Sequence, residues 1–169
     1  MANVWWKDAH RWSIIYGNYS GIEATAIPQN HNLAIIGTAA NNKLIADLLR
    51  RSIITLPDKA DSYAVKSMKD PANEKRMLLI IAGSNPSALL YAVNDFAWRY
   101  QNQIAIAYND PKHRHIALEN LPSFEWNDWP RIQDRGIWTW GYVIYDYKSF
   151  IKNMAKLRFN MLTIWNDHV

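Results

Sequence analysis

The sequence contains no cysteine, and this absence limits the chemistry open to the protein. Disulfide bonds and thiolate zinc sites are excluded, so cysteine usage does not indicate a redox compartment. The sequence also lacks an apolar run of about 18 residues, the length that spans a membrane as a helix. Its first residues show no apolar segment after a basic start, the pattern of a secretory signal peptide. We therefore expect no contact with a membrane, and the cytoplasm is the default compartment.

Several sequence motifs of catalysis and ligand binding are missing as well. There is no Gly-rich phosphate loop, no catalytic-triad signature and no helical His-Glu-x-x-His motif. His113 and His115 have a spacing found in metal sites, but no third ligand is evident, and Lys112 and Arg114 disfavour a cation. No nucleic-acid reader motif accompanies this short basic run. We expect no metal, no cofactor and no nucleic-acid partner.

Aromatic residues are abundant. They make up 13% of the 169 residues, with nine Trp and nine Tyr, while the net charge of +4 is only weakly basic. Five of the tryptophans fall near the end of the chain: Trp126, Trp129, Trp138, Trp140 and Trp165. Aromatic rings stack on the apolar C–H faces of sugars, and they also fill hydrophobic cores. Both interpretations stay open for this segment.

The first 100 residues alternate between strand and helix patterns. Four segments predict strands, of which the third alternates like a half-buried one: 12–16, 33–37, 63–68 and 77–82. Helices are expected after two capping signals, Asn41–Asn42 and Ser84–Pro86. The second helix has an apolar face that we expect to pack on strand 77–82: Leu89, Val93, Phe96, Ala97 and Tyr100. This order predicts an α/β domain in which a mixed β-sheet carries helices on one face.

A domain boundary is predicted near Pro130. Residues 109–130 are typical of a loop, in which Asp128 and the nearby Asp134 are expected to be solvated. The boundary gives an accessory α/β domain over 1–129 and a second region over 130–169. In the second region, a strand from Gly136, a helix capped by Asp146 and a strand from Met161 predict a parallel βαβ unit.

The order of these segments resembles the start of family 67 α-glucuronidases and family 20 β-N-acetylhexosaminidases. In their N-terminal α/β domain, a strand ending in Gly precedes a helix, as at Ile35–Thr38 and Ile80–Ser84 here. The helix that contains Ala88–Val93 is similar to the last helix of that domain, with Ala92 in place of the usual Gly. Arg135-Gly136 is similar to an Arg-Gly pair on their first barrel strand, and Leu157–Leu162 to the entry into their second strand.

The resemblance implies a hexosaminidase-like N-domain followed by the first βαβ of a (β/α)8 barrel, which is a TIM-type fold. The parent would be a bacterial-type glycosidase acting on a polysaccharide or glycoconjugate. In both families the catalytic carboxyl pair lies on later barrel strands. We therefore expect this chain to be inactive by itself, with its catalytic residues unknown. An alternative is that the α/β domain is a stand-alone carbohydrate-binding or protein-interaction module.

Five residues are candidates for binding the sugar: Arg135, Trp138, Trp140, Asn166 and Asp167. Arg135 corresponds to the family arginine that binds sugar hydroxyls, although an ion pair with Asp134 is an alternative. The two tryptophans share one face of a strand, as a sugar platform or as barrel-interior packing. Asn166 is similar to the Asn-rich strand ending of α-glucuronidases, whereas Trp140 replaces an Asp of hexosaminidases. Asp167 ends the second strand, where it either faces the sugar, as in barrel active sites, or is solvated.

The end of the chain carries more apolar residues than so small a unit can bury by itself. Parallel strands are normally covered on both faces, and an open strand edge recruits another chain. We therefore expect residues 130–169 either to pack against the N-terminal domain of their own or a second chain, giving a homo-oligomer, or to be loosely ordered.

Overall fold

The computed structural model describes residues 12–16, 32–109, 122–139 and 144–164. It is a mixed α/β structure, as the sequence predicts. The chain divides into two compact units, Met1–Trp129 and Pro130–Val169, at the position where the sequence places the boundary. Each unit is described separately below. Within the described residues, no helix is long and apolar enough to cross a membrane.

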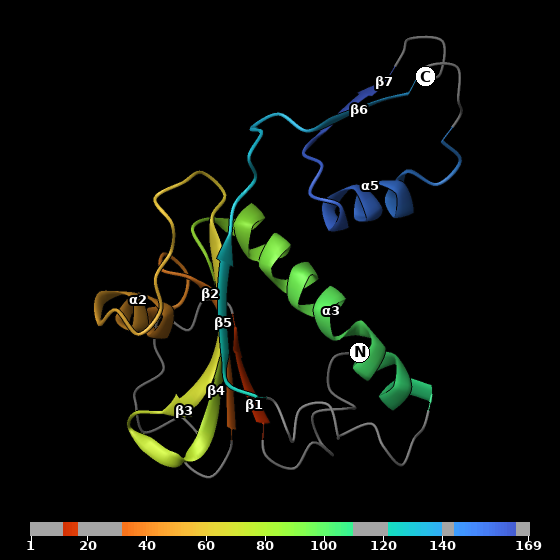
Figure 1. Ribbon diagram of the computed structural model, residues 1–169. Coiled ribbons are helices and arrows are strands. Elements are labelled where there is room, and N and C mark those ends of the chain that lie inside the picture. Colours follow the sequence, from red (N-terminus) through yellow and green to blue (C-terminus); the bar gives the residue numbers. More distant parts are fainter. Residues whose placement is uncertain (1–11, 17–31, 110–121, 140–143, 165–169) are drawn as a thin grey trace. The chain divides into compact units, whose positions relative to one another are not determined.

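The first unit contains a five-stranded mixed sheet with the strand order β1-β2-β4-β3-β5 (Figure 1). Strands β1 (Trp12–Tyr16), β2 (Asn32–Thr38) and β4 (Asn73–Gly83) run parallel, because helical or long connections separate them in the sequence. Strand β3 (Tyr63–Asp70) is antiparallel to β4, to which it is joined by a tight turn. The predicted strands are therefore confirmed, and β4 begins four residues earlier than expected.

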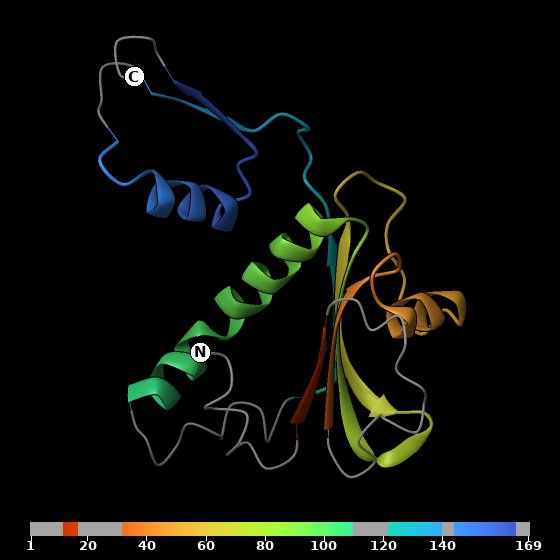
Figure 2. The ribbon, with the colours of Figure 1, turned by 180° about the vertical axis from the view of Figure 1, so that it is seen from behind.

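The two described helices of this unit cover opposite faces of the sheet, so the prediction of helices on one face is wrong (Figure 2). Helix α2 (Lys43–Arg50) buries Ile45 and Leu48 against Leu78 and Ile80 of β4. On the other face, helix α3 (Pro86–Asn109) packs Ala88, Tyr91 and Ala92 against Leu79 and Ile81. Successive side chains of a strand point to opposite faces, and the continuous apolar run of β4 therefore needs cover on both.

The same arrangement explains a second difference. Alternation over 63–68 predicts a half-buried strand, but Tyr63, Ala64 and Val65 are all buried. Strand β3 has a neighbour on each side, β4 and β5, and a helix-covered layer on each face. Its inner position therefore buries consecutive residues.

Local capping signals are confirmed at both helices. The Asn42 side chain accepts hydrogen bonds from the backbone N–H groups of Leu44 and Ile45, at the start of α2. The Asn85 Oδ1 accepts from the Ala88 N–H at 2.9 Å, and Pro86 occupies the first helical position of α3. Gly83 is the last residue of β4, and a side chain is excluded there because a Cβ would lie 2.4 Å from the Leu89 backbone nitrogen.

The buried face of α3 differs from the predicted one. Leu89 and Phe96 pack against the core as expected, but Val93 is 36% exposed. The helix is rotated so that its small residues Ala88 and Ala92 meet the sheet, which allows a close approach of the two backbones.

The loop predicted for 109–130 contains a strand, so that prediction is wrong in its second half. Strand β5 (Phe124–Asp128) pairs antiparallel with β3, with Trp126 opposite Val65. Asp128 is therefore the last residue of an edge strand rather than part of a solvated loop, and its Oδ1 accepts from the Trp129 N–H at 2.8 Å. Asp134 is exposed, as expected.

The second unit is a βαβ element, as the sequence predicts. Strands β6 (Gly136–Thr139) and β7 (Met161–Ile164) are parallel, with Trp138 opposite Thr163. Helix α5 (Tyr147–Lys156) connects them, and its N-cap is Asp146, whose carboxylate accepts from the Ser149 N–H at 3.0 Å. These hydrogen bonds from Ser149 hold the pKa of Asp146 below its usual value.

Candidate functional site

The two strands of the second unit are joined at their amino ends by Asn160. Its Oδ1 accepts from the Arg135 backbone N–H at 2.8 Å, and its Nδ2 donates to the Gln133 carbonyl at 2.9 Å. The Asn160 N–H in turn donates to the Arg135 carbonyl at 2.9 Å. This asparagine therefore fixes the register at which β7 starts beside β6.

Arg135 is part of the same junction. Its Nε donates to the Arg158 carbonyl at 2.6 Å, and its Nη1 donates to the carbonyls of Ile132 and Gln133 at 2.6 and 2.8 Å. Arg158 has a positive φ of 62°, which turns the chain between α5 and β7. The Arg135 guanidinium thus holds two loops together through main-chain oxygens.

This geometry places Arg135 differently from what the resemblance implies for it. Arg135 precedes β6, and active sites of (β/α)8 barrels lie at the carboxyl ends of the strands. The side-chain N–H groups of Arg135 donate to main-chain carbonyls near the amino ends of the strands. The part of Arg135 in sugar binding stays a prediction. Its described contacts position the amino ends of the two strands.

Trp138 is a candidate with a large exposed fraction. It lies on β6 with 59% of its surface exposed, whereas the next residue, Thr139, is buried and donates from Oγ1 to the Thr163 carbonyl at 3.2 Å. Alternation along the strand therefore points Trp138 to one face and Thr139 to the other. Trp140, Asn166 and Asp167 lie outside the described residues, as do His113 and His115.

A second polar constellation, which the sequence reasoning missed, lies in the first unit. Asp95 of α3 accepts at Oδ2 from the Tyr63 hydroxyl at 2.8 Å and from the Trp126 indole N–H at 2.9 Å. Its Oδ1 accepts from Arg99 Nε at 3.2 Å, and the Arg99 guanidinium lies 4.5 Å from the centre of the Trp126 ring. The i,i+4 spacing of Asp95 and Arg99 was a signal for part of this cluster.

The Asp95 cluster joins three elements, α3, β3 and β5, and its carboxylate is 11% exposed. Two neutral donors and one cation satisfy the carboxylate, so its charge is paired where it is buried. The arrangement is that of a structural junction, because each described oxygen of Asp95 already accepts a protein hydrogen bond.

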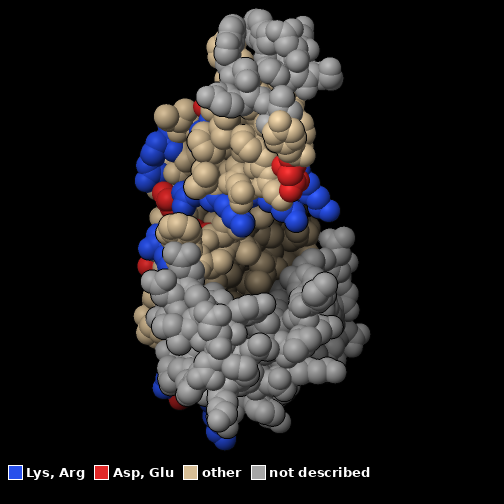
Figure 3. All heavy atoms as spheres, turned by 90° about the vertical axis from the view of Figure 1, so that its right-hand side faces the viewer, with Lys and Arg blue, Asp and Glu red and all other residues tan. Residues whose placement is uncertain are grey.

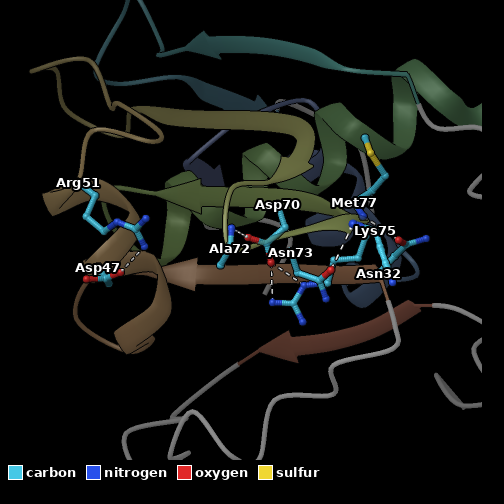
Figure 4. Close-up of polar contacts among 9 residues, drawn as sticks. Asn32, Asp47, Arg51, Asp70, Ala72, Asn73, Lys75 and Met77 are labelled. Carbon is cyan, nitrogen blue, oxygen red and sulfur yellow. Dashed lines mark hydrogen bonds and ion pairs between the residues drawn. The ribbon is translucent and has the colours of Figure 1, made fainter.

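Polar contacts at the β3–β4 turn are also structural (Figure 4). Asp70 and Arg76 form an ion pair in which the side chains are only 7% and 11% exposed, and Asp70 also accepts from the Ala72 N–H at 2.8 Å. The Asn32 side chain accepts from the Met77 N–H at 2.7 Å, which joins the start of β2 to β4. These contacts fix a turn and a strand register.

No cluster of three or more His, Cys, Asp or Glu side chains that could hold a metal ion occurs among the described residues.

Comparison with known proteins does not assign the chain to a family. No protein-family model matches it, and no curated protein is similar to it at a significant level.

Proposed function

We propose that the chain is the N-terminal region of a glycoside hydrolase that acts on a polysaccharide or glycoconjugate. In this proposal, residues 1–129 form the accessory domain, and 130–169 form the first βαβ of a (β/α)8 barrel. The observation that carries it is the parallel pair β6–β7 around helix α5, with an exposed tryptophan, Trp138, on the first strand. The residue pattern at Arg135-Gly136 and Leu157–Leu162 supports the same assignment.

The chemistry of the proposed contact is stacking. The ring of Trp138 offers an apolar face to the C–H face of a sugar, while hydroxyl groups at the ring edge need polar partners. The predicted partners are Trp140, Asn166 and Asp167, which follow the two strands in the sequence. Arg135 contributes by holding the amino ends of the strands in register.

The test is a binding titration with oligosaccharides that contain N-acetylhexosamine or glucuronic acid, followed by tryptophan fluorescence and by NMR. Trp138→Ala is expected to weaken binding about two- to tenfold, because aromatic stacking contributes about 0.5–1.5 kcal/mol. Trp98→Ala is the matched control, because Trp98 is 70% exposed on α3 in the other unit. Equal binding by wild type and Trp138→Ala, or no binding of any oligosaccharide, contradicts the proposal.

The alternative function is a carbohydrate-binding module formed by the first unit alone. It is distinguished by a chain that ends before Pro130. If residues 1–129 bind the oligosaccharides as tightly as the whole chain, the first unit is the binding module, and Trp138 has no part in it.

A further inference from the structure

The excess positive charge of the protein is concentrated in its second unit. Residues 130–169 contain six Lys or Arg and three Asp, a net charge of +3, whereas 1–129 contribute only +1. Half of these six cations lie on one helix, α5, which contains no acidic residue. Figure 3 shows one face of the protein, on which the basic side chains of the described residues cover more surface than the acidic ones.

The three lysines of α5 form a line. Lys148, Lys152 and Lys156 follow one another at intervals of four residues, so their Cα atoms are about 6 Å apart along the helix axis and on one side of it. All three are exposed, and no ion pair among the described residues includes them. The carboxylate nearest to them in the sequence is that of Asp146, which caps the helix.

An exposed apolar side chain lies beside this lysine row. Ile151 is 53% exposed, and because it follows Lys148 by three residues, the two side chains are neighbours on the helix surface. Tyr145, just before the N-cap, is 95% exposed. Met154 is buried, so α5 uses one side for packing and leaves exposed a row of cations with an isoleucine at its border.

Cations next to an exposed apolar side chain favour a lipid surface over other anionic partners. A helix that lies on a membrane places its lysines among the headgroups and its apolar side chains at the boundary of the acyl chains. Tyrosine rings are also enriched at that depth. The phosphates of a nucleic acid would pair with the lysines but would leave Ile151 in water. Absence of a spanning segment does not exclude a lipid contact, because a surface helix lies on the bilayer without crossing it.

We propose that α5 binds to the surface of a membrane that contains anionic lipids, with the lysine row at the headgroups and Ile151 at the acyl boundary. This contact goes beyond the proposed sugar binding and does not depend on it, and it departs from the sequence-based expectation of no membrane contact. The binding is weak and reversible, because three cations and one aliphatic side chain are fewer anchors than stable attachment needs.

The experiment is sedimentation of the whole chain with vesicles of phosphatidylcholine alone or of phosphatidylcholine mixed with phosphatidylserine. One variant removes the charge of the row while it preserves helix propensity: Lys148→Gln, Lys152→Gln and Lys156→Gln. The matched control changes the net charge equally at exposed positions of the first unit: Lys43→Gln, Lys59→Gln and Lys75→Gln. A further variant, Ile151→Ala, removes the apolar contact alone. Circular dichroism checks that each variant is folded.

Wild type and control are expected to bind the vesicles with phosphatidylserine at least tenfold more tightly than those without it. The variant without the three lysines should lose at least tenfold in affinity, because each lysine near an anionic surface strengthens binding about fivefold. Binding should weaken as salt is raised, since exposed charges are screened. The inference is overturned if this variant binds as wild type does, if both kinds of vesicle bind equally, or if neither binds.

Ile151→Ala separates a lipid surface from a polyanion. It is expected to weaken binding to the anionic vesicles by about fourfold for each methylene that enters the acyl boundary, and to leave binding to a single-stranded oligonucleotide unchanged. Equal vesicle binding by wild type and Ile151→Ala, or tighter binding of the oligonucleotide than of the vesicles, overturns the choice of a lipid surface. The oligosaccharide titrations with Trp138→Ala test the proposed function separately, so either proposal can fail while the other stands.

Discussion

At the scale of single residues, Asp95 connects three elements of the first unit through one carboxylate. Its carboxylate receives hydrogen bonds from Tyr63 on an inner strand and from Trp126 on an edge strand, besides the pair with Arg99 on its own helix. A hydrogen bond to a charged group contributes about 1.5–3 kcal/mol, and a buried donor left unpaired costs about 1–3 kcal/mol. One side chain therefore couples the helix to the last strand of the unit.

Replacing Asp95 by Ala is expected to lower the free energy of unfolding by about 2–4 kcal/mol, because two partly buried donors lose their acceptor. Urea denaturation followed by circular dichroism measures the change. Asp58→Ala is the control, since Asp58 is exposed and lies in a loop, and it should change stability by less than about 0.5 kcal/mol. A loss below about 0.5 kcal/mol for Asp95→Ala would show that solvent replaces these hydrogen bonds.

At the scale of elements, residues of different size on the side of helix α3 that faces the sheet determine its position. Ala88 and Ala92 are fully buried and allow the helix to approach the sheet, while Phe96 is partly buried and packs beside Phe124 of β5, with ring centroids 6.5 Å apart. Val93 lies toward solvent. The apolar face of the helix is therefore narrower than the sequence spacing indicates.

Phe96→Ala is expected to destabilise the protein by about 2–3 kcal/mol, below the ~3–5 kcal/mol of a fully buried phenylalanine because the side chain is partly exposed. Val93→Ala, one turn earlier on the same helix, should cost less than about 1 kcal/mol. Denaturant unfolding of both variants gives the comparison. Equal losses would mean that the helix is rotated from the described orientation.

At the scale of the whole molecule, the two units differ in how well they bury apolar side chains. The sheet of the first unit has five strands and a core on each face. The described part of the second has two parallel strands, and six of its large apolar residues are between 39% and 68% exposed: Ile132, Trp138, Ile151, Leu157, Met161 and Ile164. Two-stranded sheets are marginal by themselves, and parallel sheets are normally covered on both faces.

We expect the second unit either to bring two chains together or to be loosely ordered in solution. Light scattering of the whole chain is expected to give a dimer or larger oligomer if association covers these residues. A chain that ends before Pro130 should be monomeric and retain its circular dichroism, because the first unit has its own core. A monomeric whole chain whose second unit is well ordered while these apolar side chains remain in solvent would contradict this expectation.

The sequence by itself determined the local structure. Asn42, Asn85 and Asp146 cap the three described helices because their short side chains reach the first free N–H groups, a contact within three residues along the chain. Apolar runs likewise located β2 and β4, and the order of strand, helix and strand predicted the parallel pair β6–β7. For the candidate site, the sequence singled out Trp138, which the described residues leave exposed.

Only the tertiary structure decided which face of each element packs against which neighbour. Burial on both sides of β4 follows from which helix packs where, and strand β5, with its alternating polar and apolar residues, exists because β3 offers it an edge. The hydrogen bond from Arg135 to the Arg158 carbonyl depends on a turn at Arg158, 23 residues later. Hydrogen bonds between distant segments leave no periodicity in the sequence, because they depend on the path of the backbone rather than on local spacing.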